Sequence, residues 1–195
     1  ALKTIIERTG AQNGDVIFFG ADKTKIVNDA MGALRTKLGH EKGYTNGKAW
    51  EPLWVVDFPM FEFNEETKKI DFSHNPFSMP VGGAEAFENP DPLKIVSNQY
   101  DLALNGYEIL SGSIRNHDPE ALVNAFERVG YGRDEILKRF GGIYNAFHFG
   151  APPHGGFAIG VDRYFMVLID EPNIRDVYAF PLNSNGVDVL MNAPS

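Results

Sequence analysis

The chain has 195 residues with 18 Lys or Arg and 26 Asp or Glu, and its net charge of −8 argues against a protein that coats nucleic acid by itself. Hydrophobic residues make up 43% of the sequence, which excludes a disordered chain, and no apolar run reaches the roughly 18 residues of a membrane-spanning helix. Cysteine is absent, which excludes disulfides, a cysteine nucleophile and thiolate-bound zinc.

The first 40 residues combine helical and strand-like segments. Residues 2–7 resemble the middle of a helix, and the short apolar run 15–19 predicts a strand. Asp22 is expected to cap a helix that ends before Gly39. The polar, Gly-containing segment 40–51 predicts a linker, so we expect the domain boundary there.

Strand-like segments are frequent in the remainder of the chain. Pro59 interrupts the first of them and predicts an edge position or a bulge. The predicted strands cover residues 52–63, 70–72, 99–105, 107–115 and 157–159, and the predicted helices begin at Asp118 and cover about residues 134–149 and 161–169. Because successive strands are joined without helical crossovers, the pattern indicates an α+β fold with a mainly antiparallel sheet backed by helices.

A strand that passes through a glycine into a helix is the first candidate site. Gly160 precedes a predicted helix whose first turn holds Asp162 and Arg163. The free N–H groups of a helix start and a planar guanidinium suit a nucleotide phosphate. Taken alone, the segment fits the plain alternative better, in which Gly160 only permits the turn and Arg163 pairs with a surface carboxylate.

The second candidate site lies on the strand predicted for residues 107–115. Glu108 and Arg115 are seven residues apart, so strict alternation would place them on opposite faces. A bulge in the stretch Ser111-Gly112-Ser113 would bring both to one face. A carboxylate near a nucleotide can hold Mg²⁺, and an arginine can grip a carboxylate, although two solvated surface charges fit the same pattern.

The third candidate is His74, at the head of a long loop over residues 74–92. Loops of this length usually carry function, and His74 could contact a small anionic substrate; the plain alternative is a surface turn. The sequence has no P-loop, no dinucleotide fingerprint and no nucleophile elbow, and its other histidines lack the spacing of a zinc site.

The order and spacing of these segments resemble bacterial-type aspartyl-tRNA synthetases, a class II family, over essentially the whole chain. Residues 160–163 resemble the class II motif 3, and residues 105–115 resemble the family's Asn-Gly-x-Glu…Gly-Ser-x-Arg stretch. Residues 150–156 and 174–181 resemble its Pro-Pro-His loop and its Ile-Arg-Asp-Val-Ile-Ala-Phe-Pro stretch. Residues 14–22 resemble the end of the inserted GAD domain that marks the bacterial type.

The resemblance implies an incomplete class II catalytic domain. Residues 1–40 would be the end of the GAD-like insertion, and residues 41–195 the C-terminal portion of the catalytic domain. Motif 3 is included, whereas nothing in the sequence matches motifs 1 and 2 or the anticodon-binding barrel, so the isolated chain is expected to be inactive or nearly so. The family is cytoplasmic, forms homodimers when complete, and uses L-aspartate, ATP, Mg²⁺ and tRNA.

The resemblance also assigns roles to single residues. Arg163 would contact ATP, Gly160, Val161 and Asp162 would line the same nucleotide site, and Glu108 would hold ATP through Mg²⁺. Arg115 would grip the side-chain carboxylate of aspartate, and His74 would contact aspartate from the loop. The reaction would form aspartyl-adenylate and transfer the aspartyl group to tRNA.

Two departures from the family pattern affect these expectations. Many members have a second histidine where this chain has Asn75, and many have Gly-Gly-Gly-Ser at residues 110–113, where this chain reads Leu-Ser-Gly-Ser. A non-catalytic paralogue that binds aspartate or ATP, and a lysine- or asparagine-specific relative, remain as alternatives. The sequence leaves open whether asparagine tRNA is charged as well.

Overall fold

The computed structural model describes residues 1–45 and 49–194 and divides the chain into two units, Ala1–Ala49 and Trp50–Ser195. The division falls after Ala49, inside the predicted linker 40–51. It lies nine residues after residue 40, where the family resemblance places the end of the first domain. In residues 1–45 the first unit forms the helices α1 (Leu2–Thr9) and α2 (Thr24–Glu41), and none of these residues is fully buried. Its assignment to a GAD-like insertion stays a prediction.

Two sequence predictions for the first unit are wrong. Residues 15–19 form no strand; Val16 and Phe19 are 73% and 71% exposed, and none of the described residues pairs with this run, so its backbone has no ladder to join. The carboxylate of Asp22 accepts the N–H of Lys23 instead of capping the helix, so the helix begins after Lys23. At its other end the helix continues through Gly39 to Glu41.

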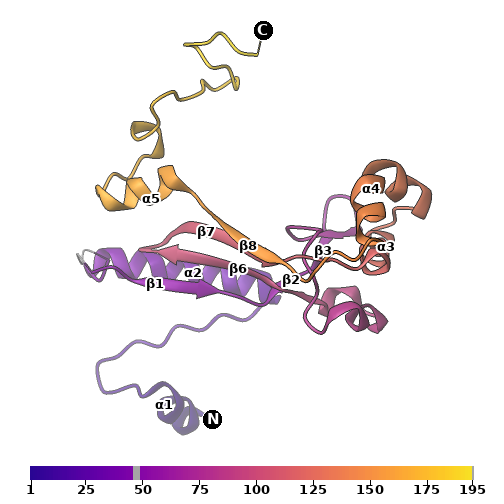
Figure 1. The fold of residues 1–195 in the computed structure, drawn as a ribbon. Helices are drawn as coiled ribbons and strands as arrows, with labels where there is room; N and C mark the ends of the chain where they lie inside the picture. Colours follow the sequence, from indigo (N-terminus) through magenta and orange to yellow (C-terminus); the bar gives the residue numbers. More distant parts are fainter. Residues whose placement is uncertain (46–48, 195) are drawn as a thin grey trace. The chain divides into compact units, whose positions relative to one another are not determined.

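An antiparallel four-stranded sheet forms the centre of the second unit, in the order β1-β6-β7-β8 (Figure 1). Every neighbouring pair is antiparallel, as the succession of strands without crossovers predicts. The α+β class is therefore confirmed. The four strands are β1 (Pro52–Val55), β6 (Gln99–Leu104), β7 (Tyr107–Ile114) and β8 (Gly155–Ile159).

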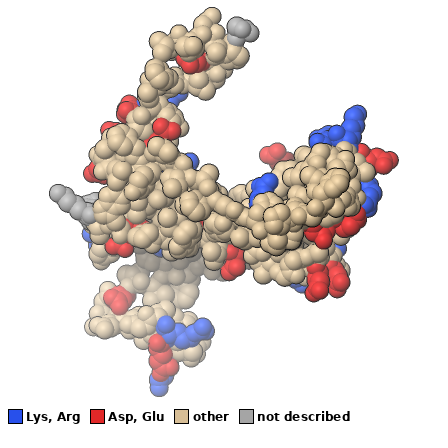
Figure 2. Space-filling model, in the orientation of Figure 1, with Lys and Arg blue, Asp and Glu red and all other residues tan. Residues whose placement is uncertain are grey.

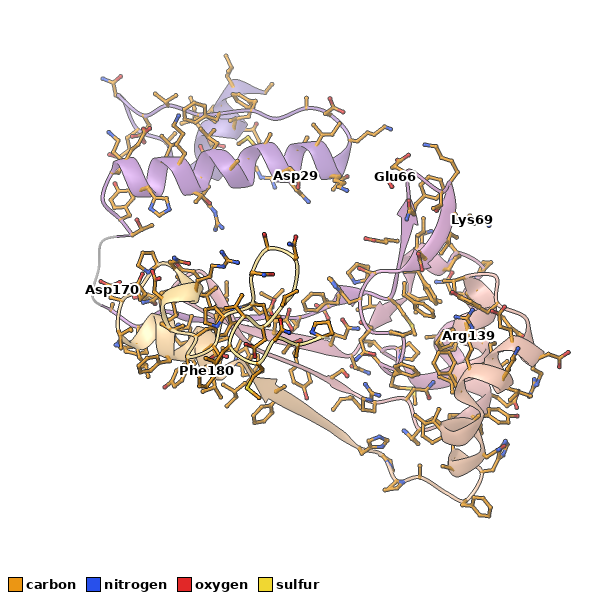
Figure 3. The ribbon with its side chains drawn as sticks, turned by 90° about the horizontal axis from the view of Figure 1, so that it is seen from above. Asp29, Glu66, Lys69, Arg139, Asp170 and Phe180 are labelled. Carbon is orange, nitrogen blue, oxygen red and sulfur yellow. The ribbon has the colours of Figure 1, made fainter. Side chains whose placement is uncertain are left out.

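Two short ribbons connect β1 to β6. Pro59 lies in a two-residue strand, which agrees with the predicted edge position, and Glu66 and Lys69 lie around the turn of the longer ribbon (Figure 3). The ribbons are β2–β5 (Phe58–Pro59 with Val96–Ser97) and β3–β4 (Phe61–Asn64 with Lys69–Phe72), and the loop between them holds the 3₁₀ turns η1 (Gly83–Glu88) and η2 (Pro92–Lys94).

The main core lies where the β3–β4 ribbon meets α3 (Pro119–Arg128) and α4 (Arg133–Phe147), at one end of the sheet (Figure 1). Asp118 caps α3, as predicted, by accepting the N–H of Ala121 at 2.8 Å. Phe126 packs against Phe72 and Phe140 with ring centroids 5.0 and 4.9 Å apart. This aromatic packing fixes α3 and α4 and thereby the loop that returns to β8.

At the other end of the sheet, β8 passes directly into α5 (Val161–Leu168), and the 3₁₀ turn η3 (Ile174–Asp176) follows (Figure 1). Val167 of α5 packs against a small core formed by Leu104, Ile109 and Leu110 of the sheet. The helix is thus anchored to the same stretch of β7 that carries Glu108.

The surface of the second unit is uneven in charge. Both signs of charge gather around α3 and α4, whereas the surface over the sheet is largely uncharged in the view of Figure 2. Leu53 and Trp54 of β1 are 63% and 55% exposed, and Phe157 of β8 is 64% exposed. Among residues 1–45 and 49–194, no helix is long and apolar enough to cross a membrane.

An ion pair ties the start of α3 to the start of α4. The Arg133 guanidinium donates to Glu120 at 2.6 Å and to the Tyr144 hydroxyl at 3.0 Å. This bond holds the pKa of the Glu120 carboxyl below its ordinary value of 4.5. A carboxyl whose pKa is lowered by folding stabilises the protein above that value and ceases to do so as the pH falls through the lowered pKa.

Glu120→Gln is therefore expected to lower the urea midpoint of unfolding slightly at pH 7, and the difference should disappear as the pH falls through the lowered pKa of Glu120. The effect should be small because both side chains are about half exposed. Glu127→Gln on the same helix is the matched control, because the described ion pairs do not include Glu127. A difference for Glu120→Gln that persists at acidic pH would contradict this account.

Candidate functional site

A β-bulge brings Glu108 and Arg115 to one cavity. In the β6–β7 ladder, Leu102 faces Leu110 and Ala103 faces Glu108, so Ile109 is the extra residue. The sequence predicts a bulge at Ser111–Ser113; its effect is confirmed, because Glu108 and Arg115 line the same cavity, but its position is wrong. Ile109 and Leu110 are 7% and 8% exposed, so two successive apolar side chains enter the core, and this burial places the bulge before the serines.

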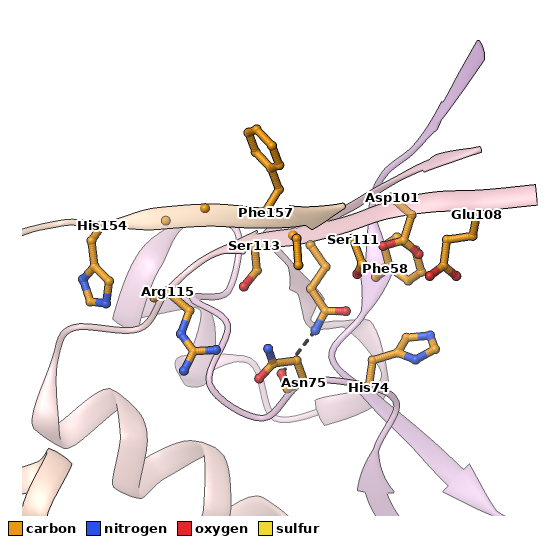
Figure 4. Close-up of a pocket in the computed structure, with 15 residues that line it drawn as sticks. Phe58, His74, Asn75, Asp101, Glu108, Ser111, Ser113, Arg115, His154 and Phe157 are labelled. Atoms are coloured by element: carbon orange, nitrogen blue, oxygen red, sulfur yellow. Dashed lines mark hydrogen bonds between the residues drawn. The ribbon is translucent and has the colours of Figure 1, made fainter. Parts of the chain in front are cut away.

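The first cavity has a volume of about 700 Å³ and brings together three of the predicted residues, His74, Glu108 and Arg115 (Figure 4). They come from the loop after β4, from the start of β7 and from the residue after its end. Polar side chains of β6 and β7 line the cavity, together with His154 and with residues of β8. The other lining residues include Phe58, Asn75, Gln99, Asp101, Ser111, Ser113, His154 and Phe157.

The loop residues around His74 are held in place by local contacts. The His74 ring lies edge-on to Phe58, with centroids 5.2 Å apart. The Asn75 side chain accepts the N–H of Phe77 at 2.9 Å, so the residue that departs from the family pattern forms an Asx turn. The Arg115 guanidinium lies 5.3 Å from the centroid of the Phe77 ring, a cation–π contact that fixes its direction.

The second cavity, of about 310 Å³, lies at the start of α5 and is lined by Gly160, Asp162 and Arg163. Glu108, Ser111 and Ala158 line both cavities, so the two share a wall. The predicted nucleotide residues and the predicted aspartate residues therefore lie in adjacent cavities. Val161 is the exception, because it lines neither cavity and is 72% exposed.

Arg163 and Glu108 contact each other across the shared wall. The Arg163 guanidinium donates to the main-chain oxygen of Glu108 and lies 3.3 Å from its carboxylate. Their side chains are 43% and 52% exposed, so the ion pair is weak and solvent-accessible. The sequence left open that Arg163 pairs with a surface carboxylate. That carboxylate is Glu108, which is itself a candidate residue of the nucleotide site.

The backbone of Gly160 does not require glycine. Its φ is −74°, and an added Cβ would meet nothing closer than 3.7 Å. Its N–H donates to Ile109 O at 2.9 Å, which ties the start of α5 to the bulge. The absent side chain leaves room at the cavity wall, where a bound group can approach the backbone.

Asp101 and Gln99 of β6, which the sequence motifs do not include, also line the first cavity. Asp101 pairs with Ser111 across the ladder and Gln99 with Ser113, so period-two alternation along β6 could have found both. The described residues contain no cluster of three acidic or histidine side chains that could hold a metal by themselves. Mg²⁺ usually needs only one or two carboxylates beside substrate phosphates, and Glu108 and Asp101 fit that requirement.

Comparison with known proteins gives one consistent family. Residues 11–184 match the family model described as tRNA synthetases class II (D, K and N). The chain is 55% identical over 193 residues to the "Aspartate--tRNA(Asp/Asn) ligase" of Acidiphilium cryptum and 52% identical over 191 residues to that of Beijerinckia indica. These alignments cover 99% and 98% of this chain but 32% of each relative, so the chain spans about a third of their length.

Solved structures show a related fold. An aspartyl-tRNA synthetase from Entamoeba histolytica matches 95% of this chain and 31% of its own, with a TM-score of 0.53 and 25% identity. An asparaginyl-tRNA synthetase from Pyrococcus horikoshii matches 93% of this chain and 34% of its own, with a TM-score of 0.50 and 20% identity. The class II architecture expected from the sequence is thereby confirmed.

Gly112 lies where three strands approach closely behind the site. A Cβ there would lie 2.5 Å from Gly156 O and 2.5 Å from the Tyr100 ring. We expect Gly112→Ala to lower the free energy of unfolding by about 1–3 kcal/mol, because β8 or the ring must move. Urea denaturation measures this.

Gly142→Ala in α4 is the matched control, because its Cβ would meet nothing within 4 Å. It should leave the free energy of unfolding unchanged or raise it by up to about 1 kcal/mol. Equal destabilisation by the two substitutions would show that the close approach of the strands is unimportant.

Proposed function

We propose that this chain, which belongs to the class II tRNA synthetases of the D, K and N group, is the C-terminal part of the catalytic domain of an aspartate–tRNA ligase. The observation that carries the proposal is the shared wall: Glu108 lines both the cavity with Arg115 and the cavity with Arg163. An enzyme that joins an amino acid to a nucleotide needs two adjacent sites of this kind. The first unit would be the end of a GAD-like insertion.

The proposed reaction has two steps. An α-carboxylate oxygen of L-aspartate attacks the α-phosphorus of ATP, the bond to the β-phosphate oxygen breaks, and pyrophosphate leaves. A terminal ribose hydroxyl of tRNA then attacks the aspartyl carbonyl carbon, and AMP leaves with the former carboxylate oxygen. Catalysis consists of positioning and charge stabilisation, with no covalent bond to the protein.

Arg115 would select aspartate through its side chain. A guanidinium forms two parallel, charge-assisted hydrogen bonds with the side-chain carboxylate of aspartate. With the neutral amide of asparagine it can form only one of them, and the charge assistance is lost. The stacking of Arg115 on Phe77 directs the guanidinium before substrate arrives. His74, exposed at the loop across the cavity, would contact aspartate from the other side.

Arg163 and Glu108 would bind ATP. The weak ion pair between them can open, so that the guanidinium contacts the nucleotide and the carboxylate holds Mg²⁺, with Asp101 as a second candidate ligand. When bound, Mg²⁺ supplies charge neutralisation at the phosphates. Gly160 and Asp162 would line the nucleotide site, whereas Val161 would contribute only its backbone at the helix start.

The relatives favour a ligase over a non-catalytic binding paralogue, and their shared name includes both tRNA(Asp) and tRNA(Asn). We therefore propose that the complete enzyme charges both tRNAs. From the family resemblance we also propose that it is a homodimer in the cytoplasm. The lysine- and asparagine-specific alternatives are not proposed, because the near relatives at 52–55% identity carry the aspartate name.

A chimera tests the proposal. This chain replaces the matching third of the Acidiphilium cryptum ligase, and aspartate-dependent ATP–pyrophosphate exchange is measured. We expect robust exchange by the chimera and none by the isolated chain, which lacks motifs 1 and 2. A folded chimera that shows no exchange, or an isolated chain that exchanges unaided, would overturn the proposal.

Arg115→Ala in the chimera should lower kcat/KM for aspartate by about 100-fold or more, since a charged hydrogen-bond pair contributes about 1.5–3 kcal/mol per bond. The KM for ATP should change little. Arg139→Ala is the matched control, because Arg139 pairs with Glu135 on α4 and lines neither cavity. Equal losses for the two variants would remove the role of Arg115.

Gly160→Ala should preserve the fold but weaken the binding of ATP. The added methyl group meets no protein atom closer than 3.7 Å, yet it projects from a residue that lines the second cavity. We expect the KM for ATP to rise about tenfold with an unchanged urea midpoint, where tenfold corresponds to ~1.4 kcal/mol. An unchanged KM for ATP would show that nothing approaches the backbone at this position.

A further inference from the structure

We propose that Gln99 is a positioning residue for aspartate recognition: its side-chain amide holds the segment His74–Asn75 over the first cavity. The proposal deepens the proposed function and rests on it. Gln99 is the first residue of β6, is 9% exposed and lines the cavity beside the predicted aspartate contacts.

The Gln99 amide is bonded to two atoms of the loop. Its Nε2 donates to the main-chain oxygen of Asn75 at 3.2 Å and to Ser78 Oγ at 3.0 Å. The dashed line at Asn75 in Figure 4 marks the first of these two bonds. A carbonyl oxygen only accepts hydrogen bonds, so the orientation of the amide is fixed by its partner.

The next part of the loop, residues 77–80, is attached to the rest of the fold by other hydrogen bonds. Main-chain N–H groups of Met79 and Asn116 donate to Ile114 O at 2.9 Å and Phe77 O at 2.8 Å, and the Asn98 side chain donates to Pro80 O at 3.2 Å. These bonds fix residues 77–80. In the part of the chain that the structure describes, Gln99 is the sheet residue that bonds to Asn75, next to His74.

The bond between Gln99 and Asn75 lies where it can influence recognition of the aspartate side chain. His74 and Arg115 line the cavity from different segments, so the space for the substrate depends on the distance between loop and strand. Gln99 connects the loop to the strand next to the one that leads to Arg115, and Gln99 pairs with Ser113 in the ladder. Loss of the amide would remove the bond from the sheet to Asn75 and loosen the loop there, although the Ser73 N–H still donates to Met60 O at 3.1 Å. The nucleotide cavity would stay intact, since Gln99 does not line it.

Two variants in the chimera separate the contributions. Gln99→Leu keeps the approximate shape but removes the donor, and Gln99→Glu places an acceptor against Asn75 O. We expect both to raise the KM for aspartate by about 5- to 20-fold, the loss of one or two neutral hydrogen bonds, with the KM for ATP and kcat within about twofold. Asn98→Ala, which loses only the Pro80 bond, should change the KM for aspartate by less than about twofold.

Hydrogen exchange on the 195-residue chain gives a second readout that needs no activity. Gln99→Leu should accelerate exchange of the Phe77 and Ser78 amides, whose acceptors belong to Asn75, but not of the Met79 amide. Unchanged exchange, unchanged KM for aspartate, or equal changes in both KM values would overturn the positioning role. Failure of both variants to fold would also overturn it, since Gln99 would then be structural.

The two proposals fail in different ways. A folded, unsubstituted chimera without exchange activity overturns the proposed function and with it the aspartate role of Gln99. An active chimera whose KM for aspartate is indifferent to Gln99→Leu overturns the positioning role alone.

Discussion

The Glu108 side chain reaches the cavity of Arg115 because β7 contains one extra residue, Ile109. Without it, seven-residue spacing on a strand would place the two charges on opposite faces. The bulge is stabilised by burial, because Ile109 and Leu110 both enter the core that α5 covers with Val167. A packing requirement behind the sheet thus decides which polar groups meet in front of it.

The same bulge fixes the second cavity. Ile109 O accepts the N–H of Gly160, and Glu108 O accepts the guanidinium of Arg163, so the start of α5 is attached to the bulge by two hydrogen bonds. The side chains of Glu108 and Arg163 add a weak ion pair that solvent reaches. The Gly160–Ile109 bond between main chains fixes the start of α5, while the ion pair of Glu108 and Arg163 lies at the wall shared by the two cavities and stays accessible to solvent.

The loop side of the first cavity depends on a different part of the fold. Aromatic packing between α3, α4 and the β3–β4 ribbon surrounds Phe77, and Phe77 in turn directs Arg115. Asn75 satisfies the local backbone through an Asx turn, and the neighbouring His74 ring packs edge-on against Phe58. The head of the loop is therefore supported by its own side chains as well as by the aromatic core.

The sequence by itself determined the helices that begin at Asp118 and Val161, the succession of antiparallel strands, and the candidate residues at Glu108, Arg115 and Arg163. Local signals were enough there, because capping, alternation and motif spacing act within a few residues. It failed at residues 15–19, where an apolar run found no partner strand, and it overlooked Asp101 and Gln99. Only the tertiary structure placed the bulge at Ile109 and made Glu108 common to two cavities. Both depend on α5, a distant part of the chain, whose Val167 packs on the core of Ile109 and Leu110 and whose Arg163 contacts Glu108.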